Sequence, residues 1–184
     1  MSVGPADGPL TWNVAGLLGD VAAADRTYPV AGVELDLGED VHQSQPLDGM
    51  VRLVRTNRGI VAHADLTTAL DAQCSRCVKD LTVPILLHLE EEYLPSLDLA
   101  TGRPLSTDDE PDALRLTDHH ELEFETPVRE AIWLAEPIAP LCRPDCPGLC
   151  IVCGGRLEEG GHDHPDAEID PRMAALLGFR EADE

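Results

Sequence analysis

The chain is poor in aromatic residues and has no long apolar run. Aromatic side chains make up 3% of its 184 residues although 43% are hydrophobic, so we expect a core of Val, Leu, Ile and Ala. No stretch approaches the roughly 20 apolar residues of a membrane-spanning helix, and the first residues lack the basic and apolar regions of a secretory signal. These absences predict a cytoplasmic protein with no membrane partner. Thiols stay reduced in that compartment, so clustered cysteines favour metal ligation over disulfides.

Motifs of the common hydrolytic metal sites are also missing. The sequence contains no HExxH, no HxE…PCxxC deaminase signature and no phosphate-cradling glycine-rich loop. A catalytic zinc would in addition need three protein ligands, an open position and a nearby general base. We therefore predict that the protein is not an enzyme. A zinc-dependent hydrolase acting on RNA or a nucleotide is the alternative hypothesis.

The charge of the chain fits solubility or a basic partner protein. A formal net charge of −22 argues against general nucleic-acid binding, because phosphate repels an acidic surface. Basic residues nevertheless outnumber acidic ones between residues 49 and 79, whereas acidic residues prevail between 95 and 125. The first stretch provides the candidate RNA-binding residues, which are Arg52, Arg55, Arg58, Arg76 and Lys79.

Hydrophobic periodicity predicts several strands. Residues 60–73 alternate between apolar and polar positions, which is typical of a long, half-buried antiparallel strand. Residues 50–55 are the expected hairpin partner, joined to it by the turn-forming residues 56–59. The same alternation predicts a third strand over 83–90 and a further strand over 33–37.

Helix signals are fewer. Thr126 followed by Pro127 predicts a helix start with Thr126 as the N-cap, and Pro137 marks its end. A last short helix is expected from Arg172 to Leu177. The predicted fold class is therefore α+β and mostly β, with long antiparallel strands and one or two short helices.

The same features divide the chain into three predicted parts. They are a leader and N-terminal segment over 1–28, a β-rich core over 29–136 with an acidic, mobile loop at 95–120, and a Cys/His tail over 137–184 packed on the core. The tail is rich in proline and glycine and cannot bury a core of its own.

Six cysteines and two histidines have the spacing of metal ligands. They are Cys74, Cys77, Cys142, Cys146, Cys150, Cys153, His162 and His164. Short CxxC-type turns are typical of tetrahedral zinc sites. A thioredoxin-type redox pair would need its CxxC at a helix N-terminus, whereas Cys74 and Cys77 lie between two predicted strands. The pattern therefore indicates a CxxC knuckle and a zinc-ribbon-like tail.

Eight donors suffice for two zinc ions. We favour one site formed by Cys74, Cys77, Cys142 and Cys146, and a second formed by Cys150, Cys153, His162 and His164. The swapped pairing and a single four-cysteine site within 142–153 stay open. Glycine pairs at 154–155 and 160–161 allow the tight turns of a ribbon. A weaker alternative is a thiol-based redox or zinc sensor that releases metal on oxidation.

Four blocks, in order, resemble the YceD family. They are Gln73 to Cys77, Pro137 to Cys142, the stretch Cys146-Pro-Gly-Leu-Cys-Ile-Val-Cys-Gly154, and Asp170 to Leu176. Ile151 stands where the family usually has proline, and His162 and His164 stand where it often has a Cys-x-Cys pair.

The resemblance implies a non-catalytic factor in ribosome biogenesis. The family is associated with accumulation of large-subunit ribosomal RNA in bacteria and chloroplasts. The implied partner is the large ribosomal subunit or its precursor, contacted through ribosomal RNA, through a basic ribosomal protein, or through both.

Overall fold

The chain divides into two compact units. The structure is a computed structural model that describes residues 8–106, 110–162, 164 and 172. One unit, here called the sheet unit, contains Met1–Ala72 and Asp80–Pro140; the other, the Cys/His unit, contains Gln73–Lys79 and Leu141–Glu184. The short segment that carries Cys74 and Cys77 thus belongs to the same unit as the remaining metal-ligand candidates.

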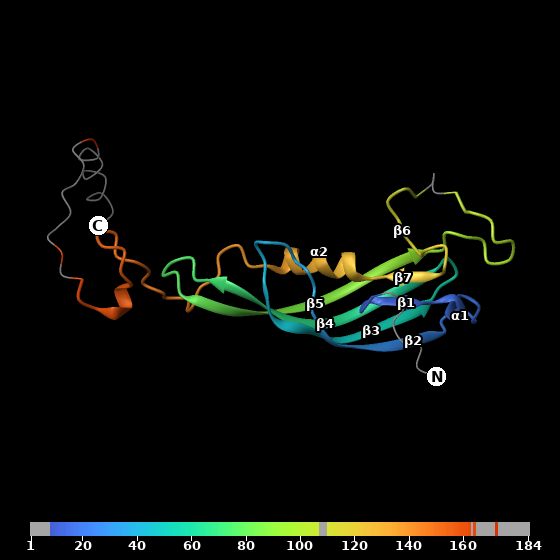
Figure 1. Ribbon diagram of the computed structural model, residues 1–184, viewed down its shortest axis with the longest axis horizontal. Helices are drawn as coiled ribbons and strands as arrows, with labels where there is room; N and C mark the ends of the chain where they lie inside the picture. Colours follow the sequence, from blue (N-terminus) through green and yellow to red (C-terminus); the bar gives the residue numbers. More distant parts are fainter. Residues whose placement is uncertain (1–7, 107–109, 163, 165–171, 173–184) are drawn as a thin grey trace, which may run out of the picture. The chain divides into compact units, whose positions relative to one another are not determined.

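A five-stranded sheet with the order β2-β3-β4-β5-β6 organises the sheet unit. Its strands are β2 (Asp25–Val33), β3 (Gln43–Arg55), β4 (Ile60–Gln73), β5 (Asp80–Leu94) and β6 (Leu114–Arg115). The β2–β3 and β3–β4 pairs are antiparallel, whereas β6 runs parallel to the end of β5 (Figure 1). The predicted class, α+β and mostly β, is confirmed.

The predicted hairpin forms the centre of this sheet. Arg55 pairs with Ile60 at its closed end, and the backbone N–H of Thr56 donates to the carbonyl of Gly59 at 2.9 Å. A Cβ on Gly59 would lie 2.0 Å from the carbonyl oxygen of Tyr93. Glycine is therefore required here because the end of β5 approaches the turn so closely.

Alternation along β4 separates the core from the solvent face. Ile60, Ala62 and Leu66 are buried on one side. On the other side His63 faces Glu90 of β5 at 3.2 Å, and Asp65 is paired with a second histidine of β5. Period-two patterning thus places one face of the strand in the core and leaves histidine–carboxylate contacts on the other.

Four of the six aromatic residues gather in one cluster. Trp12 lies 5.5 Å from Tyr28 and 6.3 Å from Phe124, and Phe124 lies 6.4 Å from Tyr93 between ring centroids. The buried Tyr93 hydroxyl donates to the carbonyl of Glu123 at 2.7 Å, and burial raises the pKa of this phenol. The aliphatic core expected from composition therefore has an aromatic end.

Short elements cover the sheet near this cluster. They are β1 (Thr11–Asn13) paired with β7 (Glu121–Glu123), α1 (Ala15–Leu18) and α2 (Glu125–Ala135). Helix α2 packs against β5, as Figure 1 shows, and buries Val128 and Ile132. Every helix among the described residues is too short or too polar to cross a bilayer.

The strand predicted over 33–37 is wrong. Strand β2 ends at Val33, and the next residues form a loop because side chains satisfy the backbone instead of a neighbouring strand. The N–H of Leu35 donates to the side-chain oxygen of Gln43 at 2.6 Å, and that of Gly38 donates to the carboxylate of Asp36 at 3.0 Å.

The predicted N-cap at Thr126 is also wrong. Helix α2 begins at Glu125 and Phe124 occupies the cap position. The carbonyl of Phe124 accepts from the N–H of Val128 at 3.2 Å, and the N–H of Phe124 donates to the carbonyl of Leu10, the residue before β1. The packing of the fully buried Phe124 ring determines where the helix starts. Capping propensity does not include such tertiary packing.

Two elements occur within the region predicted as a mobile acidic loop, 95–120. Strand β6 lies there, and Leu97 forms an isolated bridge with Pro104. The leader up to residue 7 and the last predicted helix, apart from Arg172, lie outside the described residues.

Replacing Gly49 with alanine is expected to destabilise the sheet unit by more than about 1 kcal/mol. Gly49 has φ +149°, and a Cβ there would lie 2.1 Å from the carbonyl oxygen of Asp65. Urea unfolding followed by circular dichroism measures the change. Gly19→Ala is the matched control, because its Cβ would meet nothing nearer than 3.8 Å. Equal midpoints for the two variants would contradict the close approach of β3 and β4.

Candidate metal centre

The eight ligand candidates form two groups within the Cys/His unit. Cys74, Cys77, Cys142 and Cys146 make up site one, and Cys150, Cys153, His162 and His164 make up site two. Within each group, one potential ligand atom per residue lies within 4.8 Å of the corresponding atoms of the others. This is the grouping favoured by the sequence, and neither the swapped pairing nor a single site within 142–153 matches it.

Site one has the spacing of a tetrahedral thiolate site. The sulfurs of Cys74 and Cys146 lie 3.8 Å apart, and those of Cys77 and Cys142 lie 3.7 Å apart. A tetrahedron with zinc–sulfur bonds of about 2.3 Å places its sulfurs about 3.8 Å apart. All six cysteines of the chain are free thiols, so the donors suit zinc in both kind and distance.

The turn between Cys74 and Lys79 presents two of these sulfurs. The N–H of Cys74 donates to the carbonyl of Lys79 at 2.8 Å, and the N–H of Val78 donates to the carbonyl of Cys74 at 2.9 Å. Val78 takes a positive φ of 55°, which costs a β-branched residue conformational energy. The turn thus holds a strained backbone in order to present both thiols on one side.

Hydrogen bonds and burial shift the pKa values of three thiols of site one in different directions. A backbone hydrogen bond from Cys142 lowers the pKa of Cys74 to about 6. A side-chain hydrogen bond with Cys146 raises the pKa of Cys142 to about 12, and burial raises the pKa of Cys77. Four thiolates this close repel one another unless a cation lies between them, so the donor set suits a divalent ion.

Site two combines a second knuckle with two imidazoles. The N–H of Cys150 donates to the carbonyl of Gly155 at 2.7 Å and closes the turn that carries Cys153. The Cys153 sulfur lies 3.4 Å from Nδ1 of His162, close to the roughly 3.5 Å expected of sulfur and nitrogen ligands around one zinc ion.

The other ring nitrogen of His162 is already engaged. Its Nε2 lies 2.7 Å from the carbonyl oxygen of Arg156, so Nε2 carries the proton and Nδ1 is left as a lone-pair donor. Metal-binding histidines usually have such an outer hydrogen bond. Nε2 of His164 is buried and has no hydrogen-bond partner among the described residues, as expected of a nitrogen that binds a metal.

Gly155 leaves room for this arrangement. A Cβ at this position would lie 2.8 Å from Cε1 of His162 and 3.4 Å from the Cys153 sulfur. Gly154, Gly160 and Gly161 take φ values of 72°, 70° and 75°, which L-residues with side chains rarely adopt. The glycine pairs thus have distinct roles, because Gly155 provides space and the other three provide turns.

Sequence reasoning missed Arg156. Its guanidinium donates to the backbone carbonyls of Cys77 at 3.0 Å and Val78 at 3.2 Å, both next to site one. Its own carbonyl accepts from His162 of site two. In the sequence, Arg156 is a single arginine between a glycine pair and the two histidines. That pattern does not distinguish an arginine that contacts both sites from a solvent-exposed one.

The candidate RNA-binding residues are largely engaged within the protein. Arg52 pairs with Asp25 at 3.0 Å, and Arg58 pairs with Glu110. Arg55 donates to two backbone carbonyls of the sheet unit, and Arg76 donates to the carbonyl of Cys146. Lys79 is exposed. The structure places the first three in the sheet unit and the last two in the Cys/His unit.

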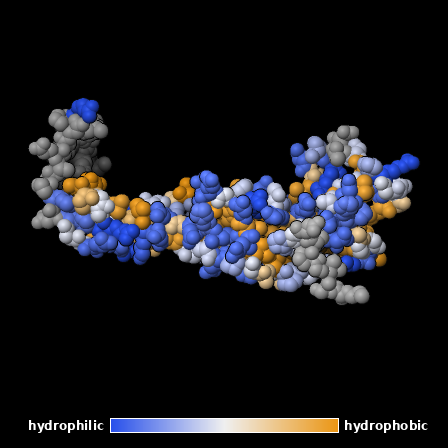
Figure 2. Space-filling model, in the orientation of Figure 1, coloured by the Kyte–Doolittle hydropathy of each residue, from blue (hydrophilic) through white to orange (hydrophobic). Residues whose placement is uncertain are grey.

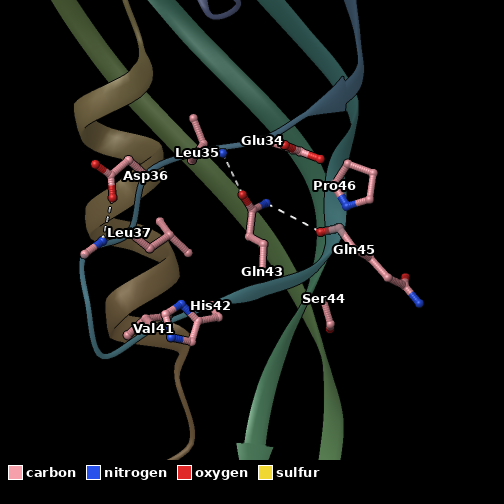
Figure 3. Close-up of a pocket in the computed structure, with 11 residues that line it drawn as sticks. Glu34, Leu35, Asp36, Leu37, Val41, His42, Gln43, Ser44, Gln45 and Pro46 are labelled. Carbon is pink, nitrogen blue, oxygen red and sulfur yellow. Dashed lines mark hydrogen bonds between the residues drawn. The ribbon is translucent and has the colours of Figure 1, made fainter.

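The sheet unit also has a cavity of about 320 Å³, lined by residues 34–38 and 41–46. Figure 3 shows Gln43 at its centre, where the side chain bonds the backbone of Leu35 and Gln45. Its amide nitrogen also lies 3.0 Å from the hydroxyl of Thr68. The lining contains none of the eight metal-ligand candidates, so this concave site and the candidate metal sites are separate.

Comparisons with known proteins agree with the motifs. The family described as Large ribosomal RNA subunit accumulation protein YceD matches residues 62–180. The uncharacterized protein Rv2926c of Mycobacterium tuberculosis is 33% identical over 154 residues, which cover 83% of this chain and 70% of the relative. The uncharacterized protein ML1660 of Mycobacterium leprae is 26% identical over 86% of this chain and 70% of its own length.

No solved structure has a significant match to this chain. The family match covers β4 from residue 62, all of β5 and α2, and the segments that carry all eight ligand candidates. Because this match covers more than half of the chain, it shows that the chain belongs to the YceD family.

Proposed function

We propose that this protein is a non-catalytic, zinc-binding factor in large ribosomal subunit biogenesis, which promotes accumulation or processing of large-subunit ribosomal RNA. The observation that carries the metal part is the convergence of eight donors into two groups with tetrahedral spacing. Family membership carries the ribosomal part.

Two zinc ions with structural roles fit these donors. Each group supplies four protein ligands, which would close the coordination sphere, whereas a catalytic zinc needs a position for water. Structural zinc stabilises small units that cannot bury enough apolar surface themselves. The Cys/His unit is of this kind, because its exposed apolar residues include Ile151, Val152 and Leu157.

A basic ribosomal protein is the favoured direct partner. The net charge of −22 attracts cationic surfaces, and on the face shown in Figure 2 hydrophilic residues predominate over the sheet unit. The ion pairs of Arg52 and Arg58 reduce the positive charge that a phosphate backbone would meet. Binding in the cytoplasm would keep such a protein soluble until its RNA site forms.

The purified protein is expected to contain two zinc ions per chain, measured by elemental analysis against protein concentration. Cys77→Ser should lose one equivalent and lower the unfolding temperature, because a structural ligand is removed. Ser75→Ala, in the same turn but outside the donor set, should keep both. A zinc-free wild-type protein would exclude the metal part of the proposal.

Site two is expected to release zinc to a chromogenic chelator before site one. Cys153 is exposed and both histidines are partly exposed, whereas Cys74, Cys77 and Cys146 are at most 2% exposed. Release should therefore occur in two phases of one equivalent each. His164→Ala should remove the fast phase and Cys142→Ser the slow one; the opposite assignment would overturn the expected order.

The same His164→Ala variant separates the structural role from the hydrolase alternative. A structural site should lose metal and local order together, seen as increased proteolysis of the Cys/His unit. A hydrolase should instead lose turnover of RNA or nucleotide substrates while the unit stays protected.

An affinity-tagged chain is expected to enrich a basic ribosomal protein and precursor large subunits at an ionic strength of about 0.15 M. Nuclease treatment should leave the protein partner bound if the contact is direct. Loss of every partner after nuclease treatment would point to RNA instead, and no enrichment before it would exclude the ribosomal proposal.

A further inference from the structure

Arg156 is the described residue whose side chain and backbone reach the two candidate metal sites. The guanidinium bonds two carbonyls of the Cys74–Lys79 turn, and the carbonyl bonds Nε2 of His162. Around it, Leu149 forms a bridge with Arg156, and the N–H of Leu157 donates to the carbonyl of Gly148 at 3.1 Å. The residue is therefore fixed in position from both sides along its backbone.

The different charges of the two filled sites indicate which site would strengthen these contacts. A zinc ion with four thiolates has a net charge of roughly −2, whereas one with two thiolates and two neutral imidazoles is close to neutral. Filling site one would therefore create an anionic centre beside the carbonyls of Cys77 and Val78. The guanidinium of Arg156, which always carries a positive charge, would be held more firmly against them.

Holding Arg156 also holds His162. Once the side chain of Arg156 is anchored, its carbonyl has a fixed position, and the hydrogen bond to Nε2 then fixes the ring with Nδ1 toward Cys153. An ordered ligand gives up less conformational entropy when it binds metal. The ion pair of Arg156 with Glu159, at 3.7 Å and exposed, lies outside this chain of contacts.

We propose that Arg156 is a positioning residue that couples the two metal sites, so that occupation of site one raises the metal affinity of site two. The inference rests on the metal binding proposed above. By linkage, occupation of site two raises the affinity of site one by the same factor.

Cobalt(II) titration of the metal-free protein without oxygen tests the coupling. Four-sulfur and two-sulfur, two-nitrogen sites have different absorption spectra, so each site can be followed separately. Site-two affinity is compared between the wild type and Cys77→Ser, in which site one cannot fill; Cys142→Ser is a second way of emptying it. We expect about a fivefold or larger loss when site one is empty.

Arg156→Ala then isolates the guanidinium, because it keeps the backbone carbonyl that bonds His162. In the Arg156→Ala background, adding Cys77→Ser should leave the metal affinity of site two almost unchanged. Glu159→Gln removes the partner carboxylate and leaves the carbonyl contacts. In this variant Cys77→Ser should lower the site-two affinity as much as it does in the wild type. If Arg156→Ala does not fold, Arg156→Gln retains one donor and should give a reduced ratio.

The outcomes separate the two proposals. Equal site-two affinity in the wild type and in Cys77→Ser would overturn the coupling while leaving both metal sites in place. A full ratio retained in Arg156→Ala would show coupling by another route and would overturn the role of Arg156. Failure of the wild type to bind cobalt or zinc would exclude the metal proposal itself.

Discussion

The convergence of sulfurs from distant parts of the chain is the constraint on which the Cys/His unit depends. Cys74 and Cys146, 72 residues apart, bring their sulfurs to 3.8 Å, and Cys77 and Cys142 do the same at 3.7 Å. Among the described residues, no strand pairing joins Gln73–Lys79 to the tail. The pairing within the tail itself is confined to the bridge between Leu149 and Arg156. Side-chain donors and arginine–carbonyl hydrogen bonds therefore hold the segments of the Cys/His unit together, as the hydrophobic core does in the sheet unit.

This difference in the source of stability matches the different burial of apolar side chains in the two units. The sheet unit buries Leu47, Val51, Leu53 and Ile60 completely, and its stability follows from the apolar area removed from water. The Cys/His unit exposes Ile151 almost fully. A unit that leaves apolar side chains in water needs another source of stability, and crowded thiols acquire one only when a cation compensates their charge.

Sequence reasoning was strongest where a period or a spacing carries physical meaning. The alternation of residues 60–73 and the turn at 56–59 predicted the central hairpin, because register and burial follow directly from parity. The spacing of the cysteines and histidines predicted which side chains could share a site. Sequence reasoning failed at 33–37, where Gln43 is the hydrogen-bond partner in place of a neighbouring strand. It also failed at Thr126, where burial of Phe124 overrides a capping preference. Arg156 could not be found because its contacts depend on the folded path of the backbone.

The long strand β5 has one further consequence. Strand β6 pairs with it only at Tyr93 and Leu94, so most of that side of β5 has no neighbouring strand among the described residues. Unpaired edges invite association with other chains, and Pro84, which lacks an N–H, together with the acidic run Glu90 to Glu92, opposes such pairing. Two copies of the chain joined along this edge would bring their acidic side chains together, so the edge opposes self-association into fibrous aggregates.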